Sequence, residues 1–119
     1  MTVREARADE LTAVMNVLDG AMLQARSDAV SAGIEAGDVL VAVVEDRVLG
    51  ALVLSGREID AVAVRRTRRG QGLGTALVEA ATERVGSPTA EFDAAVRPFY
   101  ESLGFDVRPA GDGRFRGVR

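Results

Sequence analysis

The chain has 119 residues and a formal charge of −3, with 15 arginines, 18 acidic side chains and no lysine, histidine or cysteine. That length suits one domain, and the missing residue types exclude a disulfide framework, thiolate or imidazole metal ligands and a P-loop lysine, so we predict a single domain over residues 1–119 without a metal site. No apolar run approaches the roughly 20 residues of a membrane span, and the acidic excess disfavours nucleic acid, so we expect a cytoplasmic protein without membrane or nucleic-acid partners.

The first half of the chain predicts a short strand, one or two helices and three further strands. Residues 2–6 are extended, and Asp9 is expected to cap a helix whose apolar residues recur at helical spacing as far as Met22. A short second helix and a loop are expected between Gln24 and Asp38. Three β-rich runs follow, of which the first two are expected to form an antiparallel hairpin: Val39–Val44, Val48–Leu54 and Glu58–Val64.

The second half of the chain predicts two helices that alternate with strands. Apolar residues at helical spacing from Leu73 indicate a helix that Gly86 ends. A strand over Ala90–Val96, a short helix over Phe99–Leu103 and a closing hairpin made of residues 105–107 and 114–118 complete the chain. The predicted order gives a mixed α/β fold of six to seven strands and three to four helices, with an antiparallel front half and one parallel crossover.

A basic, glycine-rich turn joins the strand that ends at Val64 to the helix that begins near Leu73. The first turn of a helix leaves about four backbone N–H groups unpaired at the positive end of the helix dipole. Glycine lets an anion approach these groups, and arginine adds charge-assisted hydrogen bonds, so we predict a phosphate or pyrophosphate at residues 71–75. The spacing of Gly70, Gly72 and Gly74 does not fit a dinucleotide fingerprint, and a turn without a ligand is the alternative.

Two motifs in this order resemble the GNAT superfamily of acyl-coenzyme A dependent N-acetyltransferases. Residues 69–74, Arg-Gly-Gln-Gly-Leu-Gly, fit the family's Gln/Arg-x-x-Gly-x-Gly/Ala loop between a strand and a helix. Residues 99–105, Phe-Tyr-Glu-Ser-Leu-Gly-Phe, resemble a later family segment. The resemblance covers about residues 39–105 and implies a GNAT-like sheet with splayed central strands and acetyl-CoA as cosubstrate.

The resemblance also implies roles for individual residues. The main chain of Val62, Ala63 and Val64 would pair with the pantetheine arm, as an added strand would. Tyr100 falls at the usual general-acid position, Glu58 matches a position where some members keep a general base, and Asp93 stands where many members have Asn. The residues implied to hold the pyrophosphate or edge its loop are Arg69, Gly70, Gln71, Gly72, Leu73, Gly74 and Thr75.

The requirements of acetyl transfer also follow from general chemistry, independently of the family resemblance. A lysine-type amine must lose a proton before it attacks a thioester, at a cost of about 4–5 kcal/mol at neutral pH, whereas an N-terminal amine pays about one pKa unit. Without histidine or cysteine the available bases are carboxylates, and Glu58, Asp60 or a water chain to one of them are the candidates. Strand alternation predicts that Glu58 and Asp60 share a face. No side chain here is a credible acyl-accepting nucleophile, so direct attack on the thioester is expected.

The leading hypothesis is therefore an N-acetyltransferase that acetylates a primary amine by direct attack. One alternative is a catalytically silent module that binds or senses acyl-CoA, and another is a nucleotide or phosphoprotein binder that uses only the helix N-terminus. Tyr100 also fits a purely structural role as a buried core tyrosine. The acceptor is expected to be a small-molecule or peptide amine, and a monomer and a homodimer are both compatible with the sequence.

Overall fold

The computed structural model describes residues 1–20 and 26–119. Its strands form one seven-stranded sheet in the order β1-β2-β3-β4-β5-β7-β6. The strands are β1 (Thr2–Glu5), β2 (Val39–Val44), β3 (Arg47–Ser55), β4 (Glu58–Val64), β5 (Thr89–Asp93), β6 (Asp106–Gly111) and β7 (Arg114–Val118). The helices are α1 (Leu11–Gly20), α2 (Ser27–Ala36), α3 (Leu73–Val85) and α4 (Arg97–Ser102), with short 3-10 turns η1 (Ala8–Glu10), η2 (Arg66–Arg68) and η3 (Ala94–Val96).

The sheet confirms the predicted mixed α/β architecture. Strands β1 to β4 pair antiparallel in sequence, as the β-rich runs and the turns between them indicate. The crossover through α3 then places β5 parallel to β4, and β7 pairs antiparallel with both β5 and β6. The expected antiparallel front half, single parallel step and closing hairpin are all present.

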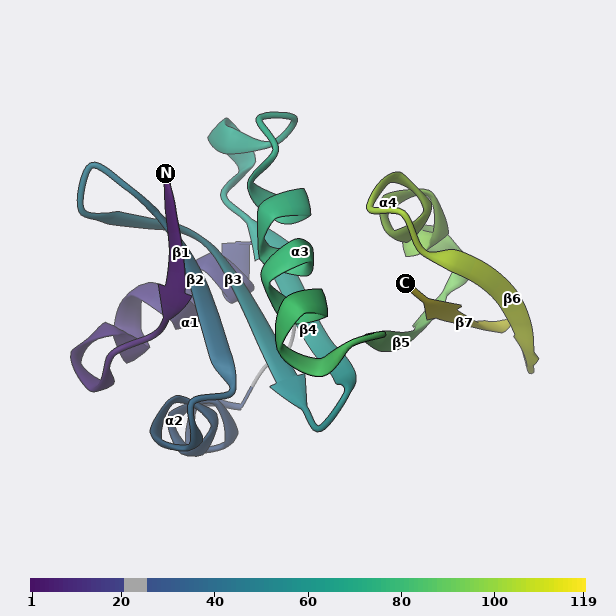
Figure 1. Cartoon of the computed structure of the whole chain (residues 1–119), viewed down its shortest axis with the longest axis horizontal. Coiled ribbons are helices and arrows are strands. Elements are labelled where there is room, and N and C mark those ends of the chain that lie inside the picture. The colour runs from purple at the N-terminus through teal and green to yellow at the C-terminus, as the bar shows by residue number, and fades with distance from the viewer. Residues whose placement is uncertain (21–25) are drawn as a thin grey trace.

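Helices cover both faces of the antiparallel half of the sheet (Figure 1). On one face α3 packs on β2, β3 and β4, and its apolar side belongs to a core that includes Leu52 and Leu77. On the other face α1 and α2 cover a second core that includes Val17 and Ile34. At Gly50 a Cβ would lie 3.1 Å from the Leu77 side chain, so glycine allows α3 to pack closely on β3.

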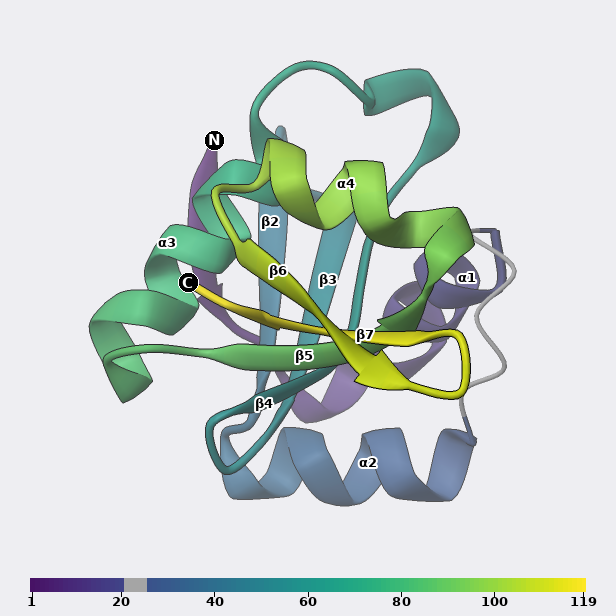
Figure 2. The ribbon, with the colours of Figure 1, turned by 90° about the vertical axis from the view of Figure 1, so that its right-hand side faces the viewer.

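The central strands β4 and β5 meet at one end only. Their parallel register consists of the single pair Glu58 and Thr89, next to a hydrogen bond from the Thr89 amide to the Arg57 carbonyl. Beyond this point β5 turns away and runs across the direction of β3 and β4 (Figure 2). On the β5 side, the edge of β4 from Val62 to Val64 therefore has no paired strand, which is the splay that the family resemblance implied.

Two local predictions are corrected by the structure, and a third extends beyond the described residues. The strand expected over 90–96 ends at Asp93, because the Asp93 Oδ1 accepts a hydrogen bond from the Ala95 amide and starts turn η3, which leads directly into α4. Asp9 does not cap the first helix; instead the Glu10 carboxylate accepts from the Arg7 amide at 2.8 Å. The first helix was expected to reach Met22. Helix α1 is described as far as Gly20, and Met22 lies outside the described residues.

No helix among residues 1–20 and 26–119 is long and apolar enough to cross a bilayer.

Candidate functional site

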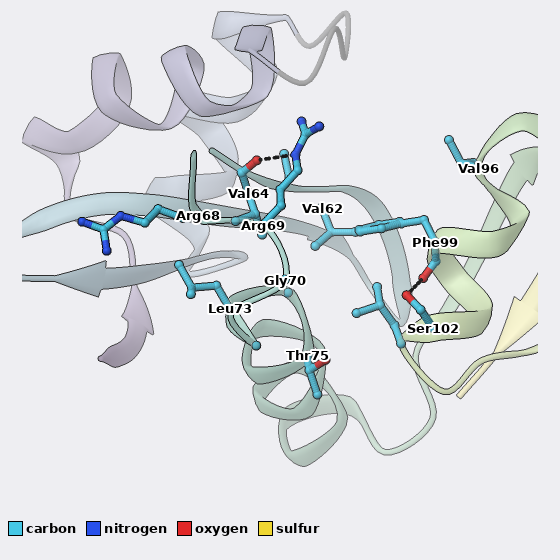
Figure 3. A pocket seen from close by; sticks show the side chains of 14 residues that line it. Val62, Val64, Arg68, Arg69, Gly70, Leu73, Thr75, Val96, Phe99 and Ser102 are labelled. Atoms are coloured by element: carbon cyan, nitrogen blue, oxygen red, sulfur yellow. Dashed lines mark hydrogen bonds between the residues drawn. The ribbon is translucent and has the colours of Figure 1, made fainter. Parts of the chain in front are cut away.

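A cleft of about 380 Å³ opens where β4 and β5 part (Figure 3). One wall is the end of β4 with the turn that follows it, and the other wall comes from η3 and α4. The cleft thus joins the two sequence motifs, which lie far apart along the chain. Its lining residues are Val62, Ala63, Val64, Arg68, Arg69, Gly70, Gly72, Leu73, Gly74, Thr75, Val96, Phe99, Ser102 and Leu103.

The turn before α3 presents bare main chain to the cleft. Gly70 and Gly72 have φ values of +77° and +83°, and a Cβ on either would meet no atom within 4 Å. The first intrahelical bond runs from the Ala76 amide to the Gly72 carbonyl, and no side chain caps the helix. The backbone N–H groups of residues 73–75 are therefore free, at the positive end of a helix dipole, with open space before them. An anion is stabilised at such a position.

Four arginines surround this turn. The Arg65 Nε donates to the Val48 carbonyl at 3.1 Å, and the Arg69 Nε donates to the Val64 carbonyl at 3.2 Å. These two bonds fasten the start and the end of turn η2 to β3 and β4. Arg68 lines the cleft and Arg66 is exposed. The turn is thus positively charged as well as open.

The opposite wall of the cleft is apolar. The Phe99 side chain extends from α4 toward Val62, with Val96 beyond it (Figure 3). Phe99 and Val96 are each 38% exposed, although both are large apolar residues. The Ser102 hydroxyl forms a hydrogen bond within α4, since it donates to the Phe99 carbonyl at 2.6 Å. The cleft therefore has a charged end at the glycine turn and an apolar end at α4.

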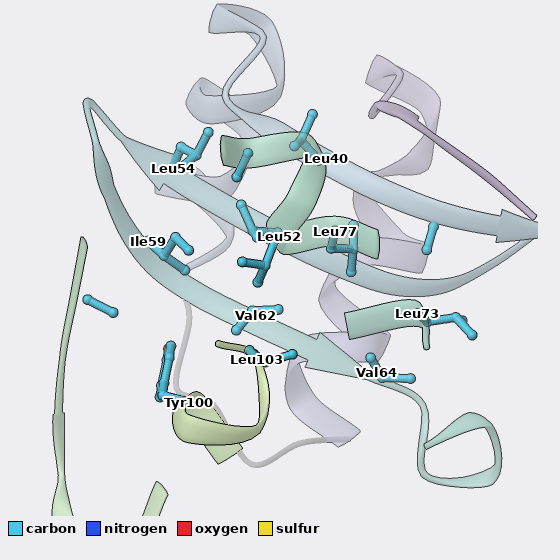
Figure 4. Packing of buried hydrophobic residues seen from close by; sticks show 14 of the residues in the cluster. Leu40, Leu52, Leu54, Ile59, Val62, Val64, Leu73, Leu77, Tyr100 and Leu103 are labelled. Atoms are coloured by element: carbon cyan, nitrogen blue, oxygen red, sulfur yellow. The ribbon is translucent and has the colours of Figure 1, made fainter. Parts of the chain in front are cut away.

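Tyr100 is not among the residues that line the cleft. It is buried in the core under α3, close to Leu103, which does line the cleft (Figure 4). Its ring stacks on Phe92 at 4.2 Å between centroids and meets Phe105 edge-on at 5.2 Å. Burial raises the pKa of Tyr100 to about 12. No described residue forms a hydrogen bond with its hydroxyl group. Because every solvent-shielded side-chain nitrogen or oxygen atom of the described residues has a hydrogen-bond partner, the Tyr100 hydroxyl oxygen must be in contact with solvent. Both the structural role and a role at the cleft mouth are compatible with this packing.

The candidate bases lie away from the cleft lining. Glu58 is at the opposite end of β4, roughly 13 Å along the strand from Val62 at about 3.3 Å per residue. Asp60 is a bulged residue, because Val53 pairs with Ala61 while Leu54 pairs with Ile59. Asp60 and Ala61 line the same hollow, whereas Ile59 and Val62 belong to the core under α3, so the alternation of side chains is interrupted after Asp60. The predicted shared face of Glu58 and Asp60 precedes this interruption and stays a prediction.

Asp60 instead lines a second hollow of about 640 Å³ between α2 and the β3–β4 hairpin. Burial raises the pKa of Asp60. Within the described part of the chain no three acidic side chains gather as a metal site would require.

A family profile described as the acetyltransferase (GNAT) domain matches residues 35–107, more than half of the chain. The chain belongs to the GNAT acetyltransferase family. Its membership makes this protein an acyltransferase, and acyl transfer from coenzyme A is the chemistry of the family. No curated protein matches this acetyltransferase.

Solved structures agree with the GNAT assignment. Ard1 from Thermoplasma volcanium superposes with a TM-score of 0.83 at 19% identity, over 99% of this chain and 95% of that one. A ribosomal-protein-alanine N-acetyltransferase from Brucella melitensis gives a TM-score of 0.73 at 21% identity, over 100% and 99% of the two chains. The PaiA N-acetyltransferase from Thermoplasma acidophilum, solved with coenzyme A, gives 0.78 at 13% identity, over 99% and 97%. At these identities the likeness establishes the fold.

The GNAT cleft brings together most of the residues singled out from sequence. Of the predicted pyrophosphate and pantetheine residues, only Gln71 is absent from the lining, and it is exposed. Sequence reasoning did not assign Arg68, Val96, Phe99, Ser102 or Leu103 to the cleft. Arg68 belongs to the basic turn, and Phe99, Ser102 and Leu103 belong to the second motif, so the two motifs carried a signal for these four residues. Val96 lies outside both motifs.

Proposed function

We propose that this GNAT protein transfers the acetyl group of acetyl-CoA to a primary amine by direct attack on the thioester. The observation that carries the proposal is the cleft itself. It joins a helix N-terminus with free amides and arginines to a free strand edge and an apolar wall. A ligand with a charged diphosphate, an amide-rich arm and a small acyl end matches these three parts in order.

In this proposal the chain's main-chain groups hold the cosubstrate. The amides of residues 71–75 bind the diphosphate, with Arg69 and Gly70 at the edge of the loop. The main chain of residues 62–64 pairs with the pantetheine amides, because β5 leaves that edge of β4 without a partner strand. We propose that residues 1–119 act as one GNAT-like domain.

The proposed reaction consists of an acyl transfer and two proton movements. The amine nitrogen forms a bond to the thioester carbonyl carbon, the carbon–sulfur bond breaks, and the nitrogen's proton leaves as the sulfur gains one. Glu58 receives the amine's proton through water, since it lies too far along β4 for direct contact.

Tyr100 is the proposed proton donor to the leaving sulfur. With a pKa of about 12 it keeps its proton at physiological pH. Transfer to a thiolate of ordinary pKa about 8.5 is uphill by roughly 5 kcal/mol. We therefore expect a contribution at the lower end of the usual range for a general acid, about 10²-fold in rate.

Calorimetric titration with acetyl-CoA, together with a thiol-release assay, tests this function. The panel contains a polyamine, an aminoglycoside, free amino acids, and peptides with either a free N-terminus or a lysine. We expect saturable binding of acetyl-CoA and amine-dependent thiol release with at least one acceptor class. The absence of any acetyl-CoA binding by the folded protein would contradict the proposal.

A catalytically silent acyl-CoA-binding module is the second candidate. It is favoured by one observation, namely that Tyr100 and Glu58 are both absent from the cleft lining. Binding of acetyl-CoA without thiol release from any amine in the panel would select this candidate over the enzyme.

A further inference from the structure

The segment from Arg65 to Arg69 carries an uncompensated positive charge. Four of its five residues are arginine, although the whole chain has a net charge of −3. The seven ion pairs among the described residues all use arginines elsewhere in the chain. Two backbone bonds, from the Arg68 amide to the Arg65 carbonyl and from the Arg69 amide to the Arg66 carbonyl, hold the four side chains around one short turn. Like charges so close together repel one another, and a bound anion relieves that repulsion.

The four arginines divide into two pairs. The Nε atoms of Arg65 and Arg69 each donate a hydrogen bond to a backbone carbonyl, at the start of β3 and the end of β4 respectively. These bonds hold the two side chains in place. Arg66 and Arg68 have no hydrogen bond or ion pair to any described residue. Their guanidinium groups keep the full planar fork that binds a phosphate in a bidentate manner.

The positive charge of the four arginines exceeds the negative charge of a diphosphate. The proposed diphosphate carries one negative charge on each phosphate and already meets the free amides of α3 and the fastened Arg69. Coenzyme A carries a further phosphate, the monoester at the ribose 3′ position, whose charge is about −1.5 to −2 at neutral pH. It is the most highly charged single group of the ligand and the one that a pair of unpaired arginines suits best.

We infer that Arg66 and Arg68 form a subsite for the ribose 3′-phosphate of coenzyme A, an inference that rests on the proposed function. The direction in which the ligand would lie in the cleft supports this position for the 3′-phosphate. Arg68 lies on the far side of the glycine turn from Phe99 and Ser102, with its guanidinium directed away from them (Figure 3). With the acyl end at Phe99 and the diphosphate at the turn, the nucleotide end of the ligand lies toward Arg68 and Arg66.

The subsite makes the protein discriminate coenzyme A from 3′-dephospho-coenzyme A. At 50 mM salt, calorimetry should show that the wild-type protein binds coenzyme A at least tenfold more tightly. The substitutions Arg66→Gln and Arg68→Gln should each reduce this preference by weakening only coenzyme A, while affinity for the dephospho form stays unchanged. Arg114→Gln is the matched control, because Arg114 is exposed, has no ion pair to a described residue and lies in the β6–β7 hairpin. The preference should shrink in 500 mM salt, since exposed charges are screened.

The outcomes separate this inference from the function on which it rests. Equal affinity of the wild-type protein for the two ligands would overturn the subsite and leave the proposed function in place. Equal weakening of both ligands by Arg68→Gln would also overturn it, because the arginine would then serve the diphosphate or the general field. Failure of the folded wild-type protein to bind either ligand would overturn both proposals. Circular dichroism of each variant confirms that the fold is retained.

Discussion

Replacement of Gly72 by alanine tests whether the open turn before α3 is a binding site or only a local feature of the backbone. Gly72 has a φ of +83°, and a Cβ there would meet no atom within 4 Å. Gly113, in the turn between β6 and β7, has a φ of +74° and equally open surroundings. The two glycines thus differ in location while sharing the same conformational requirement, so Gly113→Ala is a matched control.

Both substitutions should destabilise the folded protein by a similar amount. A left-handed backbone costs a residue with a Cβ about 1–2 kcal/mol, and no steric contact adds to this at either site. For a domain of this size, that penalty lowers Tm by roughly 4–8 °C. Thermal unfolding followed by circular dichroism measures the two shifts.

The two variants should differ in their response to coenzyme A. The methyl group of Gly72→Ala occupies the space in front of the free amides of α3, and we expect at least a tenfold loss of affinity, or about 1.4 kcal/mol. Gly113→Ala should bind with wild-type affinity. Calorimetry gives both values, and the ligand-induced rise in Tm gives an independent measure because it depends on the ratio of ligand concentration to Kd. Wild-type affinity in a folded Gly72→Ala variant would refute the placement of the diphosphate on this turn.

Three further predictions concern single side chains. Tyr100→Phe keeps the stacked ring, so stability and acetyl-CoA affinity should be unchanged in calorimetry while kcat falls about 10²-fold; an unchanged kcat would remove Tyr100 from the reaction. Glu58→Gln should slow acetylation of a lysine-type amine more than that of an N-terminal amine, and Glu83→Gln, an exposed acid on α3, should affect neither in the thiol-release assay. The hydrogen bond from Arg4 lowers the pKa of Glu10 from 4.5 to about 2, so this contribution to stability is present above about pH 5 and is lost as the pH falls toward 2. The difference in Tm between wild type and Glu10→Gln should therefore be largest near neutral pH and vanish near pH 2; a constant difference would contradict the assignment.

The glycine turn was predictable from sequence because its features are local. The free amides belong to the first turn of one helix, and Gly70 and Gly72 permit the positive φ values that the turn requires. A continuous stretch of chain, from Val62 to Thr75, therefore carries one wall of the cleft. The antiparallel strands were predictable for a similar reason, since β2, β3 and β4 are joined by short turns.

The other wall depends on contacts between distant segments, which no local pattern encodes. Phe99 faces Val62 only because the pairing of β4 with β5 stops after Glu58 and Thr89. Packing on Phe92 likewise decides that Tyr100 lies in the core instead of in the lining of the cleft.

Tertiary pairing also decided the placement of the candidate bases. The bulge at Asp60 arises from the register of β4 against β3, and it interrupts the alternation of side chains between Asp60 and Ala61. The sequence by itself thus indicated the family and determined the antiparallel strands β2 to β4 and the open, basic, glycine-rich turn, because each depends on residues close together along the chain. Only the tertiary structure decided which side chains close the cleft and which lie outside it, because those positions follow from strand divergence and packing between segments far apart in sequence.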